Sequence, residues 1–131
     1  MSRTPEIGLT NRVEITVTNS VTAAEVGSGD TLVFATPSMI ALMEKTASLS
    51  VADYLDEEST TVGTELSVEH LAATPVGMKV YCISKLEAVE GRKLTFSLEV
   101  YDETGVIGRG SHGRFIVNRL KFQGKADAKL K

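Results

Sequence analysis

The spacing of apolar and polar positions changes once along this chain. Residues 36–56 carry apolar side chains at the spacing of a helix, and Pro37 stands where the first turn of a helix tolerates proline. Thr36 comes directly before it and has a side chain able to cap a helix. We therefore predict one long helix over residues 36–56.

Most of the remaining chain alternates with the two-residue period of a strand. Turns at residues 90–91 and 104–105 are expected to join consecutive strands as hairpins. The last four strands are therefore expected to form an antiparallel meander. The expected strands cover residues 12–17, 61–72, 78–89, 92–102 and 106–119.

The predicted helix is apolar around most of its circumference. At about 100° per residue, one face carries a run of apolar residues, while Leu42 and Leu49 fall nearly opposite. Such a helix is buried on most sides, and in so short a chain only a sheet that curls around it can bury it. We predict an α+β fold, an antiparallel sheet wrapped around one long central helix. The main face carries Ile40, Met43, Ala47, Val51, Tyr54 and Leu55.

Length and composition narrow the class of protein. The 131 residues fit a single domain, expected over residues 1–131 with loose ends at about 1–11 and 123–131. The single cysteine, Cys82, and the absence of any bilayer-spanning or signal-peptide pattern make the cytoplasm the expected location, with no membrane partner. A net charge of −3 argues against a nucleic-acid partner. An uncovered sheet edge favours a homodimer.

Two polar residues occupy positions in apolar patterns. Glu44 lies within the apolar stripe of the helix, and His70 shares a strand face with Val62, Leu66 and Val68. If that face packs on the helix, the carboxylate and the imidazole can supply each other's hydrogen bond. Each alone is more often a structural residue. Together, a carboxylate and an imidazole are the minimum set of groups needed to activate a water molecule.

The start of the helix offers a third group. Thr36 sits where the first backbone amides have no acceptor within the helix. Pro37 contributes no amide, so those of Ser38 and Met39 are the candidates for stabilising an oxyanion. The structural alternative for Thr36 is an ordinary N-cap.

A glycine-rich segment, residues 108–114, contains His112 and Arg114. Its glycines fit close approach of a backbone or a ligand, or simply a bulged strand. No helix is expected after it, which disfavours a phosphate loop. With two histidines in the chain and no cluster of carboxylates, we expect no metal site.

Six short motifs follow one another at characteristic distances. They are Phe34-Ala35-Thr36-Pro37, Leu42-Met43-Glu44, Val62-Gly63-Thr64, His70-Leu71-Ala72-Ala73-Thr74-Pro75-Val76-Gly77, Gly91-Arg92 and Gly110-Ser111-His112-Gly113-Arg114. Together, over about residues 34–117, they resemble the fluoroacetyl-CoA thioesterase family of hotdog proteins. The His-x-Ala-Ala-Thr-Pro-x-Gly run, with Thr and Glu at matching distances before it, is a fairly specific signature.

The resemblance implies a hotdog fold that hydrolyses an acyl-CoA thioester. It places a catalytic set on Thr36, Glu44 and His70, and contacts to the acyl group on Gly63 and Arg114. No cofactor is expected, because CoA is part of the substrate. One feature departs from the family: the aromatic-rich stretch before its Thr corresponds here to Val-Gly-Ser-Gly-Asp. This departure predicts a more open pocket and a short- or medium-chain acyl group other than fluoroacetyl.

The expected function is therefore an acyl-CoA thioesterase that releases free acid and CoA. Glu44 would either activate water or attack directly as a nucleophile. The main alternative is a non-catalytic acyl-CoA-binding or regulatory hotdog module, although no segment resembles a DNA-binding element. A hotdog enoyl-CoA hydratase is disfavoured, because its Asp/His pair would lie on one segment. A binding domain of another fold, with Glu44 and His70 purely structural, is the third alternative.

Overall fold

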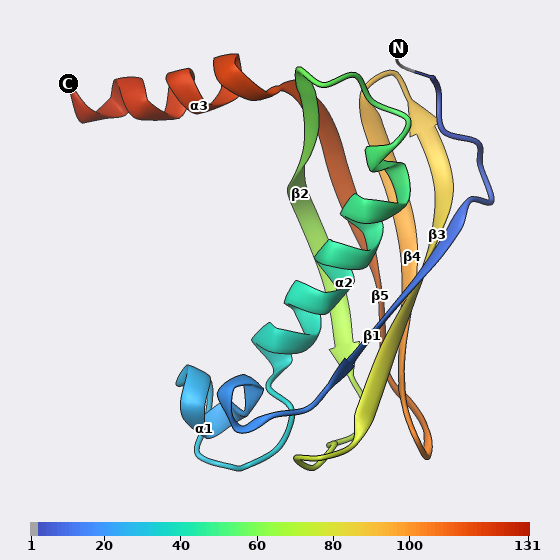
Figure 1. The fold of residues 1–131 in the computed structure, drawn as a ribbon, viewed down its shortest axis with the longest axis vertical. Coiled ribbons are helices and arrows are strands. Elements are labelled where there is room, and N and C mark those ends of the chain that lie inside the picture. The colour runs from blue at the N-terminus through green and yellow to red at the C-terminus, as the bar shows by residue number, and fades with distance from the viewer. Residues whose placement is uncertain (1–2) are drawn as a thin grey trace.

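The computed structural model describes residues 3–131. One long helix, α2 (Thr36–Ala52), lies against a curved five-stranded sheet (Figure 1). The predicted α+β fold, an antiparallel sheet around one central helix, is confirmed. The strands are β1 (Thr10–Thr16), β2 (Ser59–His70), β3 (Lys79–Glu90), β4 (Lys93–Asp102) and β5 (Gly105–Asn118). The shorter elements are η1 (Asn19–Val21), α1 (Ala23–Val26), α3 (Arg119–Asp127) and η2 (Ala128–Leu130).

The order of strands in the sheet is β1-β3-β4-β5-β2, and every neighbouring pair is antiparallel. β3, β4 and β5 form a meander as expected. The expected four-strand meander is wrong for β2, which pairs with β5 at the far edge and not with β3. Alternation predicts which residues share a face, but it carries no information on the order in which strands pair.

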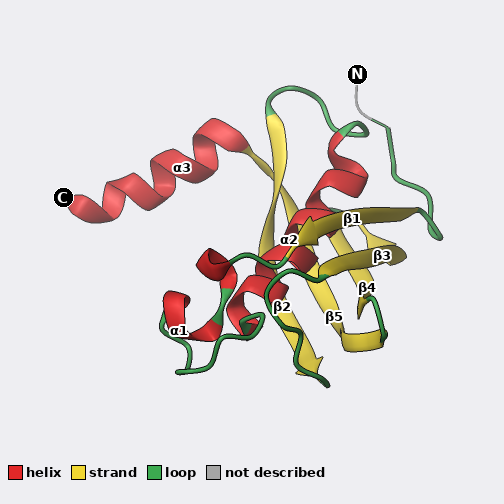
Figure 2. Cartoon of the chain, turned by 60° about the horizontal axis from the view of Figure 1, so that its bottom comes forward, coloured by secondary structure: helices red, strands yellow, loops and turns green. Residues whose placement is uncertain are grey.

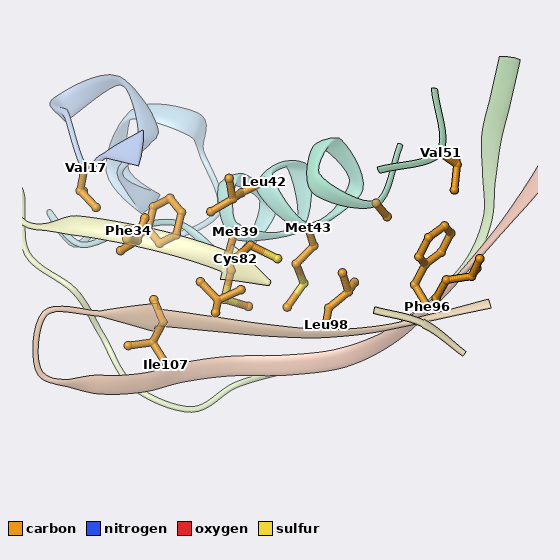
Figure 3. Close-up of a cluster of buried hydrophobic side chains, with 14 of the residues drawn as sticks. Val17, Phe34, Met39, Leu42, Met43, Val51, Cys82, Phe96, Leu98 and Ile107 are labelled. Atoms are coloured by element: carbon orange, nitrogen blue, oxygen red, sulfur yellow. The ribbon is translucent and has the colours of Figure 1, made fainter. Parts of the chain in front are cut away.

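The core lies between α2 and the sheet (Figure 3). Contrary to the expectation, α2 is buried on one side only: Leu49 is 52% exposed and Ala41 and Lys45 on the same side are exposed, although Leu42 is buried. The sheet curls over one face of the helix and leaves the other uncovered by the described residues. The buried side chains of α2 are Met39, Leu42, Met43, Thr46, Ala47 and Val51, and those of the sheet include Cys82, Leu86, Leu94, Phe96, Leu98 and Val100.

The helix α2 begins at the predicted residue, but its cap and its C-terminal end differ from the prediction. The helix begins at Thr36 with Ala35 as its N-cap, and no side chain caps it. Pro37 is therefore the second helical residue, and Thr36 is not the cap. The helix ends at Ala52, before the expected residue 56, because the chain then tightens into a turn in which the Leu55 amide donates to the Ala52 carbonyl.

The chain ends are structured over the described residues, although residues 1–11 and 123–131 are expected to be loose. The Arg3 amide donates to the Tyr54 carbonyl over 2.7 Å, and the Arg3 guanidinium lies over the Tyr54 ring; residues 1–2 lie outside the described part. At the other end, the Asn118 side chain accepts from the Lys121 amide and caps α3, which projects from the body (Figures 1 and 2). None of the helices in residues 3–131 is long and apolar enough to cross a bilayer.

Candidate active site

A short hydrogen bond joins the first residue of α2 to the last residue of β2. Thr36 Oγ1 lies 2.7 Å from His70 Nδ1, so the hydroxyl binds an imidazole instead of capping the helix. Burial lowers the pKa of His70 below its ordinary value, which keeps the ring neutral at neutral pH. His70 Nε2 is buried and has no hydrogen-bond partner within residues 3–131. The pair therefore presents a neutral imidazole with one nitrogen still to be satisfied.

The loop that follows β2 holds this pair in place. The Phe34 amide donates to the Thr74 carbonyl over 2.8 Å, and Val33 forms a bridge with Pro75. The buried Thr74 hydroxyl donates to Asp102 Oδ2 over 2.8 Å. The segment before α2 and the loop after β2 are thus tied to each other and to the β4–β5 turn.

An open cavity of about 430 Å³ lies beside Thr36 and His70. One of its walls is residues 28–31, Ser-Gly-Asp-Thr, which carry no aromatic ring. Of the two backbone amides expected to stabilise an oxyanion, that of Met39 donates to the Ala35 carbonyl over 2.9 Å. Ser38 remains as the candidate of that pair.

Glu44 belongs to a second cluster further along α2. It lies eight positions after Thr36, a rise of about 12 Å along the helix axis. Glu44 Oε2 lies 3.5 Å from Arg114 Nη1; the glutamate side chain is 45% exposed and the arginine side chain 8%. Arg114 donates from Nε to the Thr61 hydroxyl over 2.8 Å and from Nη2 to the Thr61 carbonyl over 2.9 Å. Glu44 is therefore at the rim of the core, and not within it as predicted, and a buried guanidinium holds it.

Gly63 completes this second cluster by leaving space. A Cβ at this position would lie 2.7 Å from Glu44 Oε2 and 3.2 Å from His112 Cε1. Gly63 is also the register partner of Arg114 in the β2–β5 pair. The structure thus brings three of the predicted site residues, Glu44, Gly63 and Arg114, into one place.

A bulge in β2 explains why sequence reasoning missed the fourth member, Thr61. The register shifts between Gly63 and Glu65, so the alternation changes phase there. Thr61 and Gly63 face the helix before the bulge, whereas the prediction places Val62 and Thr64 on that face. No feature of the sequence other than the glycine itself marks the bulge.

The two clusters remain separate within one chain. No hydrogen bond or ion pair joins Glu44 to His70 in residues 3–131; Glu44 pairs with Arg114, and His70 pairs with Thr36. The mutual hydrogen bond expected from periodicity is therefore not formed within a single copy. Among the same residues, no three His, Cys, Asp or Glu side chains form a group that could hold a metal ion.

Comparison with known proteins decides the family. A family model described as fluoroacetyl-CoA-specific thioesterase matches residues 17–120. The chain belongs to the fluoroacetyl-CoA thioesterase family. The resemblance read from the motifs is confirmed, and membership places the protein among thioester hydrolases.

Individual members of the fluoroacetyl-CoA thioesterase family and of the wider fold agree with this placement. The fluoroacetyl-CoA thioesterase of Streptantibioticus cattleyicolor is 38% identical over 97 residues, 74% of this chain and 70% of that protein. A solved fluoroacetyl-CoA thioesterase superimposes with a TM-score of 0.92 at 30% identity, over 97% of this chain and 98% of that one. A thioesterase superfamily member from Thermus thermophilus gives a TM-score of 0.89 at 26% identity, over 96% and 93% of the two chains.

Proposed function

We propose that this protein hydrolyses a short- or medium-chain acyl-CoA to the free acid and CoA. The observation that carries the proposal is the Thr36–His70 hydrogen bond at the mouth of the cavity, where the first turn of α2 begins. Helix starts favour developing negative charge, and a neutral imidazole beside them can exchange a proton near neutral pH. Family membership supplies the class of reaction.

The proposed mechanism draws on residues of both clusters. The thioester carbonyl sits at the start of α2, where the Ser38 amide stabilises its oxygen as charge develops. Glu44 removes a proton from the attacking water, or attacks the carbonyl carbon itself. The carbon–sulfur bond then breaks. In the base route, the proton that Glu44 took from water passes through His70 to the leaving thiolate; in the nucleophilic route, water then hydrolyses the glutamyl anhydride and supplies that proton. Arg114 holds the Glu44 carboxylate in position, and Gly63 leaves the space that it occupies. Water is the only co-reactant, so no cofactor is required.

A second copy of the chain would join the two clusters into one site. β2 is a sheet edge of twelve residues, and long uncovered edges invite strand pairing. A two-fold axis at Ser67 would pair the two β2 strands antiparallel, and because of the bulge after Gly63 it would set His70 of one copy beside Gly63 of the other. The homodimer expected from the sequence would thereby bring Glu44 of one copy towards the unsatisfied His70 Nε2 of the other.

The residues that line the cavity indicate which size of acyl group it can accept. Residues 28–31 offer small polar side chains, so the pocket can accept chains larger than a two-carbon acyl group. Relatives in this family are named for fluoroacetyl-CoA, and a variant of one was solved with acetyl-CoA. We place the reaction in the cytoplasm, because the buried Cys82 is a free thiol.

The decisive experiment follows free thiol release from acetyl-, fluoroacetyl-, butyryl- and longer acyl-CoA esters, with Glu44→Gln measured in parallel. We expect hydrolysis of several esters and a loss of about a hundredfold or more in kcat for the variant, the usual effect of removing a general base. Cleavage of fluoroacetyl-CoA alone would contradict the open pocket. Undiminished turnover by the variant would remove Glu44 from the mechanism, and tight binding without hydrolysis would favour a binding module.

A further inference from the structure

His112 is a buried histidine that the proposed mechanism has not used. It lies on β5, 2% exposed. Its Nδ1 lies 2.9 Å from the backbone carbonyl oxygen of Glu65 on β2. A carbonyl can only accept a hydrogen bond, so Nδ1 carries the proton. The neighbouring strand therefore selects one form of this ring.

The other nitrogen of His112 faces the guanidinium of Arg114. His112 Nε2 lies 3.1 Å from Arg114 Nη1. Because arginine can only donate, Nε2 must be unprotonated and accept. The same Nη1 lies 3.5 Å from Glu44 Oε2. All three guanidinium nitrogens are therefore fixed, Nε and Nη2 by Thr61 and Nη1 by His112.

We propose that His112 is a positioning residue: in its neutral Nδ1–H form it holds Arg114 Nη1 beside Glu44 and so fixes the carboxylate where it attacks or activates water. This inference rests on the proposed role of Glu44. Protonation at Nε2 would remove the acceptor and set two cations against each other. Arg114 would then turn away from His112, and the Glu44 carboxylate would lose its support.

The surroundings of His112 keep it neutral at working pH. Burial is the largest influence and lowers the pKa of His112, and the Arg114 charge lowers it further. The bond to the Glu65 carbonyl and the Glu44 carboxylate act in the opposite direction, and the net pKa is below the ordinary value. Phe96 of β4 lies against the ring with centroids 6.3 Å apart and adds no charge.

Two amide variants separate positioning from packing, because neither titrates and each keeps one of the two bonds. His112→Gln supplies an amide oxygen near the place of Nε2, so Arg114 keeps its acceptor. His112→Asn supplies an amide NH₂ near the place of Nδ1, so the bond to Glu65 is kept and Arg114 loses its acceptor. We expect His112→Asn to have a kcat about tenfold below that of His112→Gln, the cost of one charge-assisted hydrogen bond. KM should change little in either.

The pH profile and thermal stability complete this comparison. In both variants the acid side of the kcat profile should become shallower than in the native enzyme, because one protonation that lowers activity, that of His112, has been removed. Equal kcat values in the two variants, or an acid side unchanged from the native enzyme, would overturn the proposal. Loss of thermal stability alone, in equal measure, would assign His112 to packing only and would also overturn it.

A readout independent of activity keeps the two proposals distinguishable. The chain has two histidines, so nitrogen NMR of histidine-labelled protein, with His112→Gln as the assignment control, reports each ring directly. We expect the Nδ1–H form for His112 at neutral pH. An Nε2–H or charged His112 would overturn the positioning role whatever the activity. An inactive protein with the Nδ1–H form would instead contradict the proposed hydrolysis and leave the geometry intact.

Discussion

Gly63 shows how a missing side chain shapes this site. Its backbone does not adopt the left-handed conformation that favours glycine, so conformational freedom does not explain it. The space is occupied by Glu44 Oε2, which would lie 2.7 Å from a Cβ at position 63. Such a contact is too short to be tolerated without movement. Glycine is required there because a carboxylate occupies the place of its side chain.

We predict that Gly63→Ala displaces Glu44 while leaving the sheet folded. A shift of the reacting group by a fraction of an ångström should lower kcat by about tenfold or more. Gly124→Ala on α3 is the matched control, because a Cβ there meets nothing within 4 Å. Steady-state kinetics and thermal melting of both variants check this; native kcat in Gly63→Ala would show that Glu44 has room to move.

At the scale of elements, Asp102 connects the β4–β5 turn to the loop after β2. Its Oδ1 accepts from the Thr104 amide and hydroxyl, each over 2.8 Å, and its Oδ2 accepts from Thr74. Burial by itself raises the pKa of Asp102, but hydrogen bonds from Thr104, Thr74 and Gly105 lower it below its ordinary value. The loop that carries the family's Ala-Ala-Thr-Pro run is therefore anchored to a turn that is distant in sequence.

We predict that Asp102→Asn lowers the free energy of unfolding by about 1–3 kcal/mol, the cost of unsatisfied buried donors. Because the folded pKa of Asp102 lies below 3.8, its contribution is fully present above that pH and is lost as pH falls below it. Urea unfolding at several pH values checks both expectations. The stability gap between native protein and variant should be constant near neutral pH and narrow in acid; a constant gap throughout would contradict the assignment.

The elements also show where sequence reasoning succeeds and where it stops. The helix start at Thr36 and the meander from β3 to β5 follow from local period and turns. The position of β2 in the sheet does not follow from them, because β2 could pair with more than one strand and no local pattern in the sequence says which. The bulge after Gly63 shifts the alternation in the first half of β2, so that Thr61 and Gly63 face the helix in place of the predicted Val62 and Thr64. That Thr61 holds Arg114 beside Glu44 becomes evident only once β2 and β5 lie side by side.

At the scale of the whole molecule, the chain carries two separate clusters, which we propose are two halves of one site. We predict that mixing two inactive variants, Glu44→Gln and His70→Asn, restores activity if each site takes one half from each copy. Random exchange gives mixed dimers with one intact site, so about a quarter of native activity is expected. Measuring thiol release after unfolding and refolding the mixture checks this.

The same mixture also tests the opposite arrangement. If Glu44 and His70 act within one copy, every site in the mixture keeps one substitution, and activity stays at the level of the separate variants. Each variant unfolded and refolded alone is the control. Sedimentation of the native protein, which should show a dimer, separates a failure of the shared site from a failure of dimerisation.

If two copies share each site across the uncovered edge at β2, as we propose, protein concentration becomes a variable of catalysis. A single copy would then hold only half of each reacting set, so mass action would govern how many complete sites exist. Specific activity would then fall on dilution although every molecule stays folded. In a cell that makes little of this protein, most copies would then be inactive single chains, and activity would appear only when two copies associate.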